Sequence, residues 1–194
     1  MLQWEPWVPP VPEDELTAVQ ADSFAAKATR NSVYFRLLAR VPGVLRARSA
    51  LDNAVFQGEG GLPIGERELA AAVSSKVNDC IYCASVHARK AVHQTNRADD
   101  VDRLLAVRLD RDADWLAQDV ERLADGQDER WRAIVRFAAR LSTLVPSATA
   151  DDLDALRAVG LDDREVADLV HATAFFAWAN RLMLSLGEPA LPDH

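Results

Sequence analysis

The sequence predicts an all-α protein with a single domain, and three observations lead to this interpretation. The 194 residues include only 8 glycines among abundant alanines and leucines, a composition that favours helix. Apolar residues recur at helical spacing from about residue 13 onward. No segment has the pattern of a convincing β-strand. A chain of this length is expected to form one domain with a substantial core.

Residues 1–30 are predicted to form an N-terminal arm rich in proline and tryptophan, together with the first helix, and residues 31–194 to form the helical domain. The density of proline in residues 1–13 favours an extended path for the arm. Trp4 and Trp7 are large and mostly apolar side chains. We therefore expect this arm to lie along its own domain or along a neighbouring subunit.

Helices in the rest of the chain follow from the apolar periodicity. Phe35 and Leu38 indicate a helix that ends before Pro42, and Pro42 is expected to open the next one. The glycines and proline of residues 58–63 then interrupt the chain. Further helices are predicted at 65–77, 80–95, 99–108, 112–124, 128–144, 152–158 and 163–186.

Capping residues place several of these helix ends. Asp151 is expected to be the N-cap of the helix at 152–158, and Asp162 or Asp163 the N-cap of the last helix. Asn78 and Asp79 are N-cap candidates for the helix that begins near residue 80. These residues therefore predict where three of the helices start.

Charge and hydropathy exclude several classes of protein. The formal net charge is -8, with acidic and basic residues interspersed, whereas binding of nucleic acid requires a concentrated basic surface. No apolar run approaches the roughly 20 residues that span a bilayer, and the first residues do not resemble a secretory signal. We therefore expect a cytoplasmic protein that binds neither nucleic acid nor membrane.

The cysteines point to thiol chemistry. Cys80, Cys83 and His87 follow one another at steps of three and four residues, which places their side chains on one stripe of a helix. The positive end of a helix and a neighbouring imidazole both lower the pKa of a thiol, and the thiolate is the reactive form. Two cysteines one turn apart can also form a disulfide. The cluster is therefore a candidate redox site.

Glu68 lies in the preceding predicted helix, twelve residues before Cys80. If the two helices pack antiparallel, the carboxylate can approach His87 directly or through water. A carboxylate in that position orients the imidazole and increases its basicity. Glu66, two residues earlier, is expected to face solvent on the opposite side of the helix.

Two simpler interpretations of the cysteines stay open. A structural zinc ion could bind Cys80, Cys83 and His87, but zinc normally takes a fourth ligand and the sequence offers no second cysteine pair. The cysteines could also be inert core residues, since free cysteine is often buried. The joint spacing with Glu68 favours a catalytic site with no metal and no bound cofactor.

These residues resemble the AhpD-like alkylhydroperoxidases of the carboxymuconolactone decarboxylase superfamily, and most of all their uncharacterised peroxidase-related branch. The resemblance rests on Leu62-Pro63, on Arg67-Glu68-Leu69, on Cys80-Ile81-Tyr82-Cys83 and on His87. More loosely it extends over residues 31–187. One departure is Tyr82, where the characterised enzymes often have histidine.

The resemblance implies an all-helical AhpD-like fold of repeated helical units and a homo-oligomer, whether dimer, trimer or hexamer. It implies that Cys83 attacks a hydroperoxide, that Cys80 is the resolving thiol and proton donor, and that Glu68 and His87 relay protons. An external dithiol, either a lipoyl group or a thioredoxin-like protein, would then reduce the disulfide. The alternatives are a lactone-processing or decarboxylating enzyme of the same superfamily and a non-enzymatic redox-sensing oligomer.

A weak internal repeat accompanies this pattern. Residues 65–73 and 162–170 share a short motif that centres on Arg67-Glu68 in the first copy and on Arg164-Glu165 in the second. At the same offset Cys83 aligns with Asn180. We therefore expect the second half of the chain to repeat the helical architecture without the chemistry.

Overall fold

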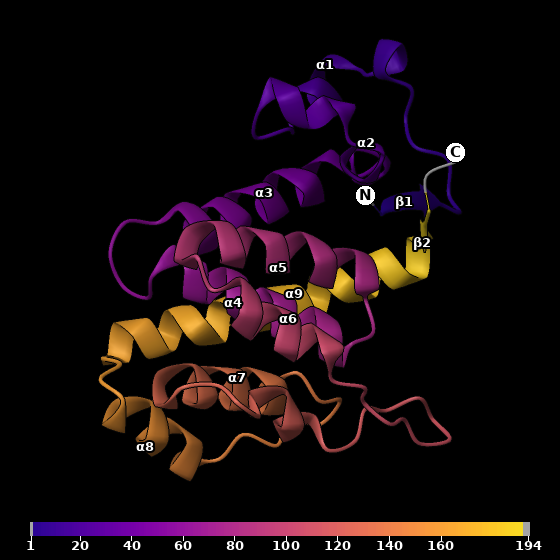
Figure 1. Cartoon of the computed structure of the whole chain (residues 1–194). Coiled ribbons are helices and arrows are strands. Elements are labelled where there is room, and N and C mark those ends of the chain that lie inside the picture. The colour runs from indigo at the N-terminus through magenta and orange to yellow at the C-terminus, as the bar shows by residue number, and fades with distance from the viewer. Residues whose placement is uncertain (1, 192–194) are drawn as a thin grey trace. The chain divides into compact units, whose positions relative to one another are not determined.

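The computed structural model describes residues 2–191, and these fold into two compact units. The first unit combines the N-terminal segment up to Gly58 with the C-terminal segment from Leu182, and the second contains Glu59–Arg181. Most described residues are helical, so the predicted fold class is correct (Figure 1). The predicted division of the chain at residue 30 stays a prediction.

In the first unit the two ends of the chain pair with each other. Strand β1 (Gln3–Pro6) is antiparallel to β2 (Gly187–Ala190), with Trp4 opposite Pro189. The sequence did not predict these strands, because four residues are too few to establish an alternating pattern. The predicted extended path of the arm is correct, and Trp4 is buried within this unit.

The helical part of the first unit consists of short segments and one longer helix. They are the 3₁₀ helices η1 (Glu13–Glu15) and η2 (Lys27–Asn31) and the α-helices α1 (Ala18–Ala21), α2 (Val33–Leu38) and α3 (Pro42–Gln57). Pro42 opens α3 as predicted, because proline at the first helical position has no amide hydrogen to leave unpaired.

The second unit holds the remaining helices. They are α4 (Ile64–Val77), α5 (Ile81–Thr95), α6 (Ala98–Ala106), η3 (Val120–Ala124), α7 (Glu129–Leu141), α8 (Ala150–Ala158) and most of α9 (Asp163–Leu186). Helix α4 is central, since it packs against α5, α6 and α7 and hydrogen-bonds to α9 (Figure 1). Its alanines at 70, 71 and 72 are fully buried and let these neighbours approach closely.

Two predictions in this unit are wrong. Residues 112–119 are not helical: Asp112 accepts hydrogen bonds from the backbone amides of Asp114 and Leu116, both at 2.9 Å. Such local side-chain bonds compete with a helix, and only η3 remains of the predicted segment at 112–124. At the start of α8, Thr149 is the N-cap in place of Asp151 and forms a capping box with Asp152.

Glu66 is also placed differently from the prediction. Its side chain is buried and forms a two-point ion pair with Arg130 of α7, at 2.8 and 2.7 Å. The face of α4 opposite Glu68 therefore contacts another helix and not solvent. Among the helices within residues 2–191, none is both long and apolar enough to cross a bilayer.

Candidate active site

The turn between α4 and α5 places the first cysteine. Asn78 ends α4, and Asp79 adopts a left-handed conformation with φ of 64° that reverses the chain. The backbone amide of Cys80 then donates to the carbonyl of Ser75, at 2.9 Å. Cys80 itself is the N-cap of α5, so the predicted N-caps Asn78 and Asp79 belong to the end of α4 and to the turn.

Helices α4 and α5 pack closely as an antiparallel pair (Figure 1). At the far end from the turn, a side chain at Gly65 would clash with Thr95 and press on Gln94 of α5. Because glycine has no Cβ, the two helices can approach at this point. The pairing brings Glu68, one turn further along α4, against His87.

Glu68 and His87 make direct contact. His87 Nδ1 lies 2.5 Å from Glu68 Oε2, and both side chains are buried. With Glu68 ionised, Nδ1 donates this hydrogen bond and Nε2 is the basic nitrogen of the neutral ring. The other carboxylate oxygen, Oε1, lies 3.4 Å from Nζ of Lys90, which is half exposed. The sequence motif did not predict this contact, although Lys90 follows His87 by three residues.

The two cysteines are free thiols and both are buried, with 2% of Cys80 and 5% of Cys83 exposed. The pKa of Cys80 is lowered, and the main cause is a hydrogen bond from the Cys83 thiol. The Asn180 side chain lowers it further, whereas burial and the Asp79 carboxylate act in the opposite direction. In the reduced pair Cys80 is thus the more favourable site for negative charge.

Tyr82 lies between the cysteines, where the resemblance departs from the characterised enzymes. Burial raises the pKa of its hydroxyl, and negative charge on Cys83 and Cys80 raises it further, while Arg89 opposes this shift. The hydroxyl therefore stays protonated at neutral pH. It is a neutral neighbour of the dithiol and not a second titrating group.

Helix α9 contributes residues that the sequence analysis did not assign to the site. The ring of Phe176 packs edge-on against His87, with 4.0 Å between the ring centroids. Asn180 is fully buried beside the turn that carries Cys80. The internal repeat did contain a signal for Asn180, since its offset aligns this residue with Cys83. Both motifs of the repeat begin a helix, but α9 continues where α4 ends at its turn.

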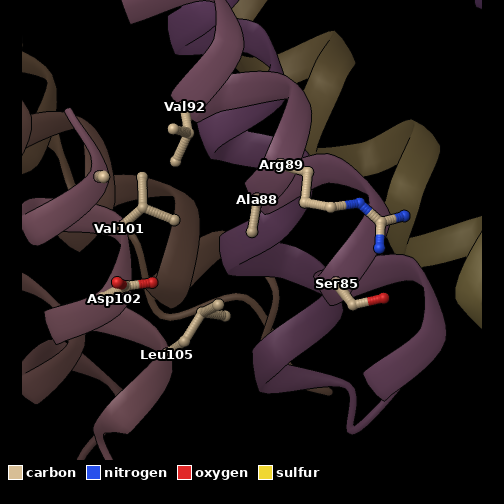
Figure 2. A pocket seen from close by; sticks show the side chains of 8 residues that line it. Ser85, Ala88, Arg89, Val92, Val101, Asp102 and Leu105 are labelled. Carbon is tan, nitrogen blue, oxygen red and sulfur yellow. The ribbon is translucent and has the colours of Figure 1, made fainter. Parts of the chain in front are cut away.

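A separate pocket of about 350 Å³ lies between α5 and α6 (Figure 2). Its lining consists of Ser85, Ala88, Arg89, Val92, Ala98, Val101, Asp102 and Leu105. Ser85 and Val92 are about half a helical turn away from the stripe of Cys83 and His87. The pocket therefore opens on the other side of α5 and does not contain the thiols.

Within residues 2–191, no group of three or more His, Cys, Asp or Glu side chains could hold a metal ion. Tetrahedral zinc sites in proteins take four such ligands. Glu68 and His87 are in contact, and Cys80 interacts with Cys83 in the same hairpin of α4 and α5; the catalytic roles expected for these four residues stay predictions.

Comparisons with known proteins agree with this architecture. Residues 42–126 match the carboxymuconolactone decarboxylase family. No curated protein matches the chain. The family match covers α3 to η3 and therefore includes the whole hairpin of α4 and α5.

Solved structures resemble the chain over most of its length. An uncharacterised peroxidase-related protein from Ralstonia eutropha JMP134, described as an alkylhydroperoxidase AhpD core, has a TM-score of 0.72 at 24% identity and covers 92% of this chain and 88% of its own. A peroxidase-related protein from Silicibacter sp. TM1040 has a TM-score of 0.71 at 23% identity, over 96% and 94%. The debrominase Bmp8 has a TM-score of 0.69 at 16% identity, over 92% and 89%. The chain therefore has the AhpD-like fold, and its residues 42–126 match the carboxymuconolactone decarboxylase family.

Proposed function

We propose that this chain is a thiol-dependent peroxidase that reduces hydroperoxides with the Cys80/Cys83 dithiol. The observation that carries the proposal is the 2.5 Å contact between Glu68 and His87 beside two buried free thiols. A buried carboxylate that orients an imidazole is the arrangement expected of a general base for a nucleophile. The peroxidase-related proteins of the same fold support this reaction class.

In the proposed first step, His87 accepts the proton of the Cys83 thiol and Glu68 stabilises the resulting imidazolium. The Cys83 sulfur attacks the outer oxygen of the hydroperoxide ROOH, and the O–O bond breaks. Cys83 becomes a sulfenic acid, and the alkoxide takes the proton from His87 to leave as ROH. The sulfur is oxidised by two electrons and the peroxide is reduced by two.

In the second step the Cys80 thiolate attacks the Cys83 sulfur. The S–O bond breaks, the hydroxide takes up a proton and leaves as water, and the disulfide forms. The lowered pKa of Cys80 supports a role as the attacking thiolate in this step. It does not favour the role of proton donor that the family resemblance implied. An external dithiol, of a lipoyl group or a thioredoxin-like protein, then reduces the disulfide and is itself oxidised.

The first test is rapid-mixing measurement of peroxide consumption by wild type and by Cys83→Ser, Cys80→Ser and Glu68→Gln variants, with mass spectrometry of the 80–83 peptide. Cys83→Ser is expected to abolish consumption, and Cys80→Ser to leave a single turnover that ends as a sulfenic acid. Glu68→Gln is expected to slow the reaction by roughly 10²–10⁴-fold, because His87 loses the carboxylate that orients it and stabilises its protonated form as general base. Lys90→Met is a control that removes the exposed neighbour of the same carboxylate. If both thiols stay free after peroxide treatment, the proposed reaction is wrong.

Reductive debromination is a second candidate, and the aromatic ring of Phe176 against His87 favours it. A flat ring can stack or pack edge-on against such a neighbour. A cysteine-to-alanine variant of the debrominase Bmp8 is known in complex with 2,3,4-tribromopyrrole. In a balanced reaction, the dithiol and an aryl bromide would give the disulfide, the debrominated arene, bromide and a proton. Bromide release from 2,3,4-tribromopyrrole, without peroxide consumption, would favour this candidate.

A further inference from the structure

A buried polar cluster lies beside the turn that carries Cys80. Asn180 Oδ1 of α9 accepts a hydrogen bond from Asn78 Nδ2 at 3.2 Å, and Asn180 Nδ2 donates to Ser75 Oγ at 3.0 Å. Ser75 and Asn180 have no solvent exposure. An amide at such a position is costly to bury unless it is hydrogen-bonded.

The hydrogen bonds also fix which way the Asn180 amide points. The hydroxyl of Ser75 donates to the carbonyl of Ala71 at 2.7 Å, so its oxygen can only accept from Asn180. The amide nitrogen of Asn180 is therefore on the side of Ser75, and the oxygen is on the side of Asn78. An amide nitrogen has two hydrogens, and the bond to Ser75 uses one of them.

The same two partners are linked to Cys80. The carbonyl of Ser75 accepts a hydrogen bond from the backbone amide of Cys80, and Asn78 precedes Cys80 by two residues. Asn180 is thus tied to the last turn of α4 and to the residue that begins the reversal of the chain. A shift of its side chain would move the N-cap of α5.

We propose that Asn180 is a positioning residue of the dithiol, whose second amide hydrogen bonds to the Cys80 sulfur and holds it as the thiolate of the reduced pair. This inference deepens the proposed peroxidase function. It rests on that function only for the role of the Cys80 thiolate, which is to attack the oxidised Cys83. The direction of the Cys80 pKa supports the assignment, since Asn180 lowers this pKa in addition to the Cys83 thiol. The second half of the chain would then contribute to the site through the residue that aligns with Cys83.

The charged and titratable groups near Cys80 shift its pKa in both directions. The Asp79 carboxylate opposes the thiolate, and Arg111 partly neutralises it from a distance of 3.4 Å. Tyr82 stays protonated, and the Cys83 thiol donates to the Cys80 sulfur. Because a hydrogen bond to the thiolate stabilises the reduced pair relative to the disulfide, Asn180 is expected to make the pair a stronger oxidant.

The test measures Cys80 by itself, in a Cys83→Ser background, through the rate of alkylation by iodoacetamide as a function of pH. Asn180→Ala is expected to shift the profile to higher pH and to slow alkylation at pH 7 by roughly tenfold, as loss of a hydrogen bond to a charged group implies. Asn180→Asp, with nearly the same shape but a negative charge, is expected to slow it more. Thr173→Val is the matched control, because Thr173 is a fully buried polar residue of α9 that donates only within its own helix.

A second readout uses the intact cysteine pair. At equilibrium with a glutathione buffer, the disulfide-to-dithiol ratio of Asn180→Ala is expected to be roughly tenfold higher than that of wild type. The same lost stabilisation of the Cys80 thiolate causes this change and the change in alkylation. Circular dichroism monitors folding of each variant, and Asn180→Asp serves where Asn180→Ala does not fold. If a folded Asn180 variant has the alkylation profile of Thr173→Val, the residue is only structural and the proposal is overturned. Alkylation needs no peroxide, so an altered profile in a protein without peroxidase activity would reject the function and retain the positioning role.

Discussion

At the scale of single residues, the carboxylate of Glu68 is the feature that distinguishes this site from an ordinary cysteine pair. One of its oxygens contacts His87 and the other faces Lys90. The first contact follows from the sequence, because the spacing in both helices fixes it once they pack antiparallel. The second depends on the rotamer of a long, half-exposed lysine, which no spacing rule specifies.

Asp79 offers a direct test of the electrostatics of the dithiol. Its carboxylate disfavours the Cys80 thiolate, so Asp79→Asn is expected to lower the pKa of Cys80 further and to speed alkylation several-fold below neutral pH. Asparagine tolerates the left-handed conformation at this position, which keeps the turn intact. Alkylation is measured in the Cys83→Ser background. Asp114→Asn, in the exposed loop, removes the same charge elsewhere, and identical profiles for the two variants would contradict the prediction.

The erroneous expectation for Glu66 has a physical reason. Two residues along a helix separate Glu66 from Glu68 by more than half a turn, and this much the sequence showed. It could not show that α7 supplies Arg130 to the opposite face. A carboxylate is normally exposed to solvent, but an ion pair with a residue from a distant segment offsets the cost of desolvation and allows it to be buried.

At the scale of elements, the helices with strong local signals were predicted best. Helix α9 has the predicted bounds, and the amide of Glu165 donates to Asp162 at 2.8 Å, as expected of an N-cap. Helix α5 begins one residue after the predicted start. The helix predicted at 112–119 is absent although the apolar spacing there resembles that of a helix. The side chain of Asp112 hydrogen-bonds to the backbone, and Trp115 has a left-handed conformation, so this segment forms a loop.

The close packing of α4 on α5 depends on Gly65, and this gives a prediction about stability. Gly65→Ala is expected to lower the free energy of unfolding by about 1–3 kcal/mol, because the new methyl group meets Thr95 and Gln94 and must displace them. Gly43→Ala in α3 is the control. Nothing lies within 4 Å of a Cβ at Gly43, and alanine favours helix, so stability is expected to rise by up to about 1 kcal/mol.

Urea denaturation of both glycine variants measures these changes. The Gly65 substitution should also slow peroxide consumption, since displacement of α4 moves Glu68 relative to His87. Equal stability of the two variants would show that the helices can separate without cost and would remove the structural basis of this prediction.

At the scale of the whole molecule, the pairing of β1 with β2 ties the beginning of the described chain to its end. Trp4 is 7% exposed and donates from Nε1 to the carbonyl of Met183 at 3.1 Å. Trp4→Ala is expected to destabilise the protein by about 3–5 kcal/mol, as for other buried tryptophans. Trp7 is 59% exposed, so Trp7→Ala is expected to cost under about 1 kcal/mol.

Thermal denaturation compares the two tryptophan variants, and limited proteolysis tests whether the arm is released. Rapid cleavage near residue 8 in Trp4→Ala but not in Trp7→Ala would agree with an arm held by its own unit. Equal sensitivity would instead point to the neighbouring subunit of a homo-oligomer. Light scattering measures that assembly directly, as a dimer, trimer or hexamer.

The hairpin of α4 and α5 has a consequence for the order in which the site is built. The contact of His87 with Glu68 spans 19 residues, whereas that of Asn180 with Ser75 spans 105. Local contacts form sooner than distant ones, since they close shorter loops. A nascent chain therefore acquires both thiols and their base well before the helix with Asn180 has been synthesised. During that interval the cysteine pair is reactive without its final surroundings, and premature oxidation at this stage would trap the hairpin before α9 packs on it.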